Sequence, residues 1–345
     1  SAAREDLSDE YPGQELWFLD VTNILNPQYS AKFTRYSNKW LALLFCSFEQ
    51  PILLDADTVP FTTFERYYQS ERFKNSGTFF FKDRKLKSNP LKKKHLLAFN
   101  RIVTTLLGLH FPRKHSLHIF HAQLSLQLND EISVKTVENL LLKGHRHHME
   151  SGLVVINKRR HLFSLLASIS LQFSSIQEEF HGDKDWFWFG QFLLDGEFTF
   201  HPVDASNVGK LKNVALAEFQ GELYQICSVQ LSHTDVDGRM LWLNGGLNVC
   251  KKCSWDYDYK NNKRIAETFN DVNELQQYYQ SPVELEGAVI PDVDKEGWGY
   301  SGECAGFNYC TLYKQGEFGK VIKFSESEKQ NYREFVRIWN LPVSF

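Results

Sequence analysis

Two aspartates that directly follow an apolar run are the residues of this chain best suited to metal chemistry. In ILLDADTVPF, residues 52–61, Asp55 and Asp57 come after the run 52–54. In a strand, residues two apart point to the same side, so both carboxylates would leave its end on one face. Mg²⁺ and Mn²⁺ take oxygen ligands and commonly share them with substrate phosphates. The pair therefore predicts a metal site for a phosphate-containing substrate, and the alternative is a solvated turn.

A second set of candidates precedes another apolar run, at 153–156. Glu150 carries a carboxylate that could accept hydrogen bonds from sugar hydroxyls, and Gly152 would let the backbone approach a sugar or phosphate closely. We expect Glu150 in a catalytic role and Ser151 with Gly152 in donor binding. The alternative is a turn glycine beside an exposed glutamate.

The segment DKDW combines carboxylates with a large aromatic side chain. Asp183 and Asp185 are the catalytic candidates, and Lys184 and Trp186 are candidates for binding an acceptor. Carbohydrate sites often pair a carboxylate for the hydroxyls with an aromatic face for the C–H surface of the ring. The competing interpretation is that Asp183 only caps the start of a helix.

A fourth set follows the apolar run 240–243. Asn244 could give the metal an oxygen ligand, and Gly245 and Gly246 permit a tight turn around a phosphate. His233 competes with Asn244 as the third metal ligand. We assign no metal role to three clustered histidines in a Gly- and Arg-containing stretch, because the expected metal prefers oxygen. These are His145, His147 and His148.

The elements that must position these residues read as α/β. Apolar runs at 16–19, 52–54, 153–156 and 240–243, with another near 214–219, alternate with helical periodicity at 32–48 and 162–173. A run without polar alternation is typical of a strand buried on both faces, so we expect a central mixed, mostly parallel sheet flanked by helices.

The last quarter of the chain differs in composition. Residues 256–320 favour loops and short strands, and a capping box at 325–328 predicts a final helix. We therefore expect a catalytic domain at 1–255 and a loop-rich extension at 256–345 packed on the same domain. Four of the six cysteines fall at 250–310, which favours disulfides and a secretory compartment over zinc.

Composition limits the classes of partner. Of the 345 residues, 39 are basic and 42 acidic, so the overall charge does not attract nucleic acid. The longest apolar stretch falls far short of the ~20 residues that a membrane helix needs. Because the chain opens Ser-Ala-Ala without Met, we expect any membrane anchor to lie upstream of it.

Five blocks in this order resemble the fungal Golgi mannosyltransferases that extend mannan and other protein-linked mannose chains. The blocks are ILLDADTVPF, SGTFFFKDR, ESGLVVINKRRH, GDKDWFWFG and DVDGRMLWLNGGLNVC, and the resemblance covers about residues 15–255. The LWLNGGL form is more similar to the α-1,3 branch of that family than to the α-1,2 branch. Family members place a nucleotide-binding strand well upstream of the aspartate pair, whereas only 54 residues precede Asp55, so contacts to guanine stay unassigned.

The resemblance implies a GT-A-like fold, GDP-mannose as donor, and Mn²⁺ or Mg²⁺ bound by Asp55 and Asp57. It also implies a mannose-terminated glycan as acceptor, a retained anomeric configuration, and a type II membrane protein of the Golgi lumen. The alternatives are an α-1,2-mannosyltransferase or another nucleotide-sugar transferase, and a glycan-binding protein of the same fold without turnover. In each transferase the metal would neutralise the charge of the leaving diphosphate.

Overall fold

Among the residues that the structure describes, strand pairing is antiparallel throughout the four sheets, contrary to the expected mostly parallel sheet. The computed structural model describes residues 2–6, 15–85, 90–109, 117–180, 182–194, 196–214 and 219–341. An apolar run reports burial, whereas strand direction depends on the side from which the chain re-enters the sheet, which periodicity does not encode. The mixed α/β composition itself is confirmed.

The strands form sheets with the orders β1-β2, β15-β12-β7-β10-β11-β4, β13-β14-β9-β8 and β3-β6-β5. Their bounds are β1 Ala2–Asp6, β2 Glu15–Leu19, β3 Ile52–Leu54, β4 Thr58–Pro60, β5 Thr78–Lys82, β6 Met149–Ile156, β7 Ser206–Gly209, β8 Lys212–Asn213, β9 Leu223–Ser228, β10 Leu231–Thr234, β11 Met240–Asn244, β12 Gly287–Ile290, β13 Trp298–Tyr300, β14 Tyr309–Lys314 and β15 Lys320–Lys323.

The helices gather around these sheets. Their bounds are α1 Pro27–Ser30, η1 Arg35–Ser37, α2 Asn38–Phe45, α3 Glu65–Gln69, α4 Glu71–Ser76, α5 Lys93–Leu107, α6 Leu117–Gln127, α7 Glu131–Lys143, α8 Leu162–Gln172, η2 Ser175–Glu179, α9 Lys184–Leu193, α10 Trp255–Asn261, α11 Lys263–Thr268, α12 Val272–Gln280, η3 Cys304–Gly306 and α13 Glu326–Trp339. None of the described helices is long and apolar enough to cross a membrane.

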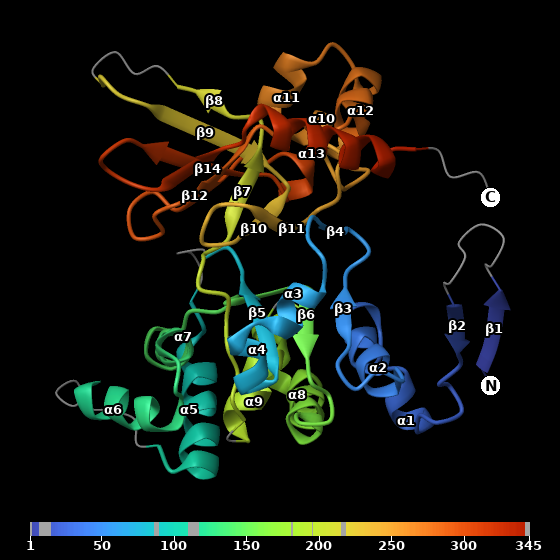
Figure 1. Cartoon of the computed structure of the whole chain (residues 1–345), viewed down its shortest axis with the longest axis vertical. Helices are drawn as coiled ribbons and strands as arrows, with labels where there is room; N and C mark the ends of the chain where they lie inside the picture. Colours follow the sequence, from blue (N-terminus) through green and yellow to red (C-terminus); the bar gives the residue numbers. More distant parts are fainter. Residues whose placement is uncertain are drawn as a thin grey trace.

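One half of the molecule is built on strand β6, with β3 and β5 beside it and helices α2–α9 around them (Figure 1). All eight residues of β6 are buried, and the apolar run 153–156 predicts this for the last four of them. Strand β3 is different, because it lies at the sheet edge and Leu54 is 38% exposed. The expectation that β3 is buried on both faces is therefore wrong. A three-residue run is too short to show whether one of its faces meets solvent.

The other half contains the six- and four-stranded sheets with helices α10–α13 (Figure 1). The six-stranded sheet combines strands from both sides of residue 255, since β12 and β15 follow this residue and β12 pairs with β7, which precedes it. The division into 1–255 and 256–345 stays a prediction. The expected run near 214–219 lies largely outside the described residues. Helix α13 begins at the predicted capping box of Ser325 and Glu328. Helices α10–α12 occupy part of the segment expected to hold only loops and short strands.

The chain crosses between the halves at the aspartate pair (Figure 1). Asp55 to Asp57 form a turn between β3 and β4 rather than the end of a strand, with Thr58 N–H donating to the Asp55 carbonyl at 3.0 Å. The backbone N–H of Asp55 donates to the carbonyl of Gly152 at 2.9 Å. The turn is thereby fixed to strand β6.

Two disulfides confirm that late cysteines form such bonds, although only one of the two joins cysteines within the cluster at 250–310. Cys227–Cys310 joins β9 to β14, and Cys250–Cys304 joins the segment after β11 to η3. Cys253 is free and exposed. The second disulfide closes a loop of 54 residues, so it restricts the unfolded chain substantially.

We expect the double replacement of Cys250 and Cys304 by alanine to lower the free energy of unfolding by about 2–4 kcal/mol. Urea titration followed by fluorescence measures this value. The matched control is Cys253→Ser, which removes an exposed free thiol and should change stability by less than about 0.5 kcal/mol. Equal stability of the double variant and the wild type would show that this disulfide does not form.

Candidate active site

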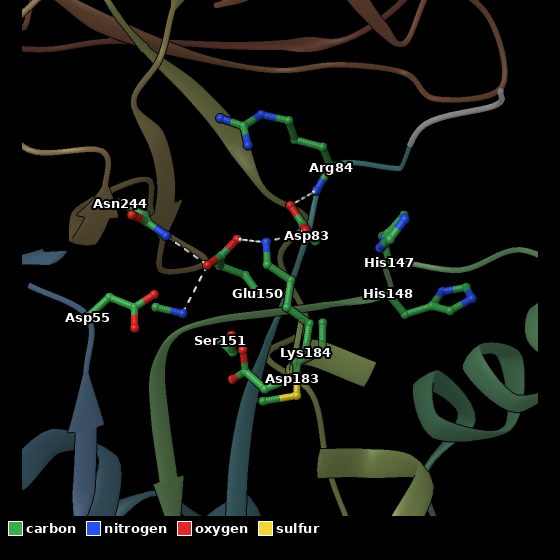
Figure 2. Close-up of polar contacts among 12 residues, drawn as sticks. Asp55, Asp83, Arg84, His147, His148, Glu150, Ser151, Asp183, Lys184 and Asn244 are labelled. Atoms are coloured by element: carbon green, nitrogen blue, oxygen red, sulfur yellow. Dashed lines mark hydrogen bonds and ion pairs between the residues drawn. The ribbon is translucent and has the colours of Figure 1, made fainter. Parts of the chain in front are cut away.

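A cavity of about 470 Å³ lies where the two halves meet, and most of the predicted site residues line it. Figure 2 shows Asp55, Glu150, Ser151, Asp183, Lys184 and Asn244 converging from different segments of the chain. Five carboxylates and five cationic side chains line this cavity, so its formal charges balance. They are Asp55, Asp57, Asp83, Glu150 and Asp183 with Lys39, Arg84, Lys184, Lys251 and Lys252. We call it the donor-site cavity, because residues predicted to bind a donor, such as Asp55 and Asn244, line it.

Glu150 has a partner on each of its two carboxylate oxygens, although it is only 1% exposed. Its Oε1 accepts hydrogen bonds from Gly152 N at 2.9 Å and Asn244 Nδ2 at 2.8 Å, and its Oε2 lies 2.7 Å from Lys184 Nζ (Figure 2). Burial, the largest influence, would raise the pKa of Glu150, but Lys184, Asn244 and Arg84 together outweigh it and lower that pKa. Glu150 thus stays ionised and positions Asn244 and Lys184.

Lys184 bridges two carboxylates instead of facing outward. Its Nζ lies 2.7 Å from both Asp83 Oδ2 and Glu150 Oε2. Burial disfavours the charged form, yet the carboxylates of Asp83 and Glu150 raise the pKa of Lys184. The acceptor-binding role predicted for Lys184 therefore competes with two ion pairs inside the protein.

Lys39, from helix α2, is a site residue that the sequence analysis missed. Its Nζ lies 2.7 Å from Asp55 Oδ1 and 3.2 Å from Asp183 Oδ2, and it donates to Ser151 O and Oγ at 3.1 Å. Burial alone would lower the pKa of Lys39, but Asp183 and Asp55 raise it. The available signal was a lysine among the apolar residues of NKWLALLF.

Three oxygen-bearing side chains that line the cavity suit a hard divalent cation. Asp57 Oδ2 lies 3.2 Å from Lys251 Nζ, and the Oδ1 atom of Asn244 is buried without a hydrogen-bond partner among the described residues. No group of three His, Cys, Asp or Glu side chains that could hold a metal occurs within the described ranges. Mg²⁺-type sites typically use one or two carboxylates together with substrate phosphates and water. Asp55, Asp57 and Asn244 fit that pattern.

The structure contradicts two of the sugar-facing assignments. Asp185 is 2% exposed, and its carboxylate accepts hydrogen bonds from the backbone N–H groups of His147, His148 and Met149. Trp186 is fully buried in the hydrophobic core and stacks with Phe99. Asp185 therefore anchors the segment that enters β6, and Trp186 cannot form the wall of an acceptor site.

His233 is not a metal ligand either. It is fully buried, stacks on Trp242 with ring centroids 4.3 Å apart, and lies outside the lining of the donor-site cavity. Burial lowers the pKa of His233 to about 3. Of the three histidines given no metal role, His147 does line this cavity, so it is a site residue.

The predicted glycines make contacts within the protein instead of forming an open turn around a phosphate. The N–H groups of Gly245 and Gly246 donate to the carbonyl of Asp57 at 3.0 and 2.8 Å, which holds the aspartate turn. A Cβ at Gly152 would lie 2.9 Å from Asn244 Nδ2, 3.0 Å from Thr58 Oγ1 and 3.0 Å from a ring carbon of Trp242. Gly152 is required because these side chains approach its backbone.

Other cavity residues have no signal in residue spacing. Arg84 follows β5, and its guanidinium lies 4.8 Å from the ring centroid of Tyr309. Lys251, Lys252 and Phe307 come from the disulfide-linked segments, with Lys252 Nζ 4.9 Å from the Phe307 ring. Only the tertiary fold brings these segments to the aspartate pair.

Comparison with known proteins identifies the family. A family model described as "Mannosyltransferase putative" matches residues 1–235. The chain belongs to this mannosyltransferase family.

Three relatives from Saccharomyces cerevisiae are named as alpha-1,3-mannosyltransferases, one of them as probable. The chain is 55% identical to alpha-1,3-mannosyltransferase MNT2 over 97% of this chain and 59% of that protein. It is 48% identical to probable alpha-1,3-mannosyltransferase MNT4, over 99% and 58%, and 30% identical to alpha-1,3-mannosyltransferase MNT3, over 95% and 54%. The chain thus spans a little over half the length of these relatives.

We expect Gly152→Ala to lower the free energy of unfolding by about 1–3 kcal/mol, because the added methyl group forces Asn244, Thr58 or Trp242 to move. Urea titration measures the loss. The control is Gly299→Ala, where the nearest atom to an added Cβ is 3.5 Å away and the change should be small. A Gly152→Ala variant as stable as the wild type would contradict the close packing.

His233 predicts acid sensitivity of the fold. A group whose native pKa is depressed contributes stability above its unfolded pKa, here 6.5, and this contribution is lost as pH falls toward about 3. We expect His233→Phe to reduce the slope of unfolding free energy between pH 6 and 4 by ~1.4 kcal/mol per pH unit.

Urea titrations across that pH range measure the slope. The His233→Phe variant should keep part of the pH dependence of its unfolding free energy, because burial also lowers the pKa of His201, to about 4. The control is His118→Phe, whose side chain is exposed in the folded chain and should leave the slope unchanged. An unaltered slope in His233→Phe would show that His233 is already protonated in the native state.

Proposed function

We propose that this chain is the catalytic part of an enzyme that transfers mannose from GDP-mannose to a terminal mannose of a protein-linked glycan, forming an α-1,3 bond with retention. The observation that carries the proposal is the convergence of Asp55, Asp57, Asn244 and Asp183 on one cavity. Family membership and the names of the relatives supply the sugar and the linkage.

Charge balance in the donor-site cavity supports dependence on a divalent cation. Five carboxylates there match five cations, so the anionic diphosphate of a nucleotide sugar adds negative charge that the protein does not neutralise. Asp55, Asp57 and the Oδ1 atom of Asn244 would hold Mn²⁺ or Mg²⁺. When bound, such an ion stabilises the negative charge on the leaving diphosphate.

The side chains of the protein supply the remaining chemistry. Lys251, Lys252 and Arg84 line the cavity and offer positive charge to the donor phosphates. Asp183 is 1% exposed, and apart from its ion pair with Lys39 its Oδ2 has no hydrogen-bond partner in the described part of the chain. This carboxylate is suited to balance positive charge at the anomeric carbon or to attack it.

The proposal includes a location. We place the enzyme in the Golgi lumen, as a type II membrane protein whose anchor lies outside this chain. The two disulfides support an oxidising secretory compartment, where such bonds persist.

The test is mannose transfer from GDP-mannose to α-linked mannobiose, with Mn²⁺ or with chelator. We expect metal-dependent product, and at least a 100-fold lower rate for Asp57→Asn, since electrostatic stabilisation of a leaving group is worth several kcal/mol. Linkage analysis of the product identifies the bond. Asp237→Asn serves as control, because Asp237 lies outside the cavity. Transfer that is unaffected by chelator and by Asp57→Asn would contradict the proposed dependence on a metal. A preference for a UDP-sugar would contradict the assignment of GDP-mannose as the donor.

A further inference from the structure

A second cavity, of about 630 Å³, adjoins the donor-site cavity. It lies among helix α7, the histidine-rich segment before β6, and the loop between β12 and β13. Asp83 and His147 line both cavities. Figure 2 shows His147 on the side of Asp83 that faces away from Asp55 and Asn244. The two cavities therefore meet at the side chains of Asp83 and His147.

At Arg84, a layer of side chains lies between the two cavities. Arg84 lines the donor-site cavity, and its guanidinium lies 4.8 Å from the ring centroid of Tyr309 and 5.4 Å from that of Trp298. Tyr309 lines the donor-site cavity and Trp298 the second one. The Arg84 Nη2 atom donates to the Val229 carbonyl at 3.1 Å, which fixes the layer in place.

The backbone is strained where the cavities meet. His147 has a φ of 63°, in the left-handed region that a histidine rarely adopts. The Asp185 carboxylate, buried at the start of α9, holds this conformation by accepting hydrogen bonds from the N–H groups of His147 and His148. Strain of this kind costs about 1–3 kcal/mol and is typically retained where it serves a binding or catalytic site.

The lining of the second cavity favours an uncharged ligand rich in hydroxyls. Five carboxylates and five lysine or arginine side chains surround it. Several are already paired, such as Lys82 with Asp204 at 2.7 Å and Lys85 with Asp294 at 3.7 Å. Burial lowers the pKa of His145, His147 and His148, so the histidines add little positive charge. An anion gains no net attraction there, whereas hydroxyl groups find donors and acceptors throughout.

Trp298 adds an aromatic face to this polar lining. Its side chain is partly exposed and packs edge-on against Tyr309, with an angle of 85° between the ring planes. An aromatic face beside carboxylates and amides suits a sugar ring, which presents both C–H surface and hydroxyls.

We propose that the second cavity binds the sugars that precede the terminal mannose of the acceptor. The inference rests on the proposed mannose transfer and adds to it the place where these preceding sugars bind. The terminal sugar lies in the donor-site cavity, the chain passes His147, and one or more preceding sugars lie against Trp298.

The experiment measures kcat/KM for methyl α-mannoside, α-linked mannobiose and α-linked mannotriose, with hydrolysis of GDP-mannose in the absence of acceptor as a parallel readout. We expect kcat/KM to rise about tenfold or more with acceptor length in the wild type. Lys135→Trp, at an exposed position of α7 that lines only the second cavity, should obstruct it and abolish this rise. Trp298→Ala should reduce the rise while leaving the shortest acceptor nearly unaffected.

Lys94→Trp is the matched control, because Lys94 is an exposed helix lysine that lines neither cavity. It should keep the preference for longer acceptors, and both Lys94→Trp and Lys135→Trp should keep the wild-type rate of donor hydrolysis. Equal kcat/KM for all acceptors, or a length preference that survives Lys135→Trp, would overturn the inference while mannose transfer stands.

If the chain neither transfers mannose nor hydrolyses GDP-mannose, the proposed function is refuted. The second site can then still be tested by measuring the binding of a saccharide directly. Titration of the chain with mannotriose should still show binding that Lys135→Trp removes and Lys94→Trp retains. Binding that is absent in the wild type, or unchanged in Lys135→Trp, would refute the second site on its own.

Discussion

The buried ion pair between Glu150 and Lys184 is the interaction on which the site depends. A carboxylate and an ammonium group removed from water are tolerated only when each finds charged and hydrogen-bonded partners, and loss of one partner typically costs about 3–5 kcal/mol. Lys184 finds Asp83 as well, and Glu150 finds Asn244 and the N–H of Gly152. The network therefore ties the end of β5, strand β6, strand β11 and the start of α9 together, and these elements come from both halves of the molecule.

The geometry of helix α9 explains why neighbouring carboxylates have different roles. Residues two apart in a helix are related by a rotation of about 200° around the axis, so their side chains point to nearly opposite sides. Asp183, at the N-cap, pairs with Lys39 beside the aspartate turn. Asp185 turns into the protein and accepts hydrogen bonds from the amides that lead into β6. One carboxylate is thus available to a substrate, and the other holds the backbone that shapes the cavity.

Charge balance recurs in both cavities and has different consequences in each. In the donor-site cavity, fixed carboxylates beside a buried, unpartnered amide oxygen leave a place for a cation that accompanies an anionic donor. In the second cavity, paired lysines and aspartates leave polar groups without net charge. An anionic donor and a neutral saccharide chain are the ligands that suit these two environments, and His147 lies where they would meet.

The sequence by itself determined the segments that carry chemistry. Asp55, Asp57, Glu150, Ser151, Asp183 and Asn244 all line the cavity, and each lies next to the end of a strand or helix. Local rules also located β6, β11, α8 and the capped start of α13, and the cysteine cluster correctly indicated disulfides but not their pairing.

Tertiary structure alone decided which side chains face the cavity and how the strands run. Asp185, Trp186 and His233 have the right chemistry, but each points into the core, since orientation depends on packing partners that are distant in sequence. Lys39 and Lys251 reach the aspartate pair from 16 and 194 residues away along the chain, and no local spacing reports such contacts. The direction of the strands was likewise undetermined, because apolar patterning measures burial, whereas direction follows from the path of the chain between strands.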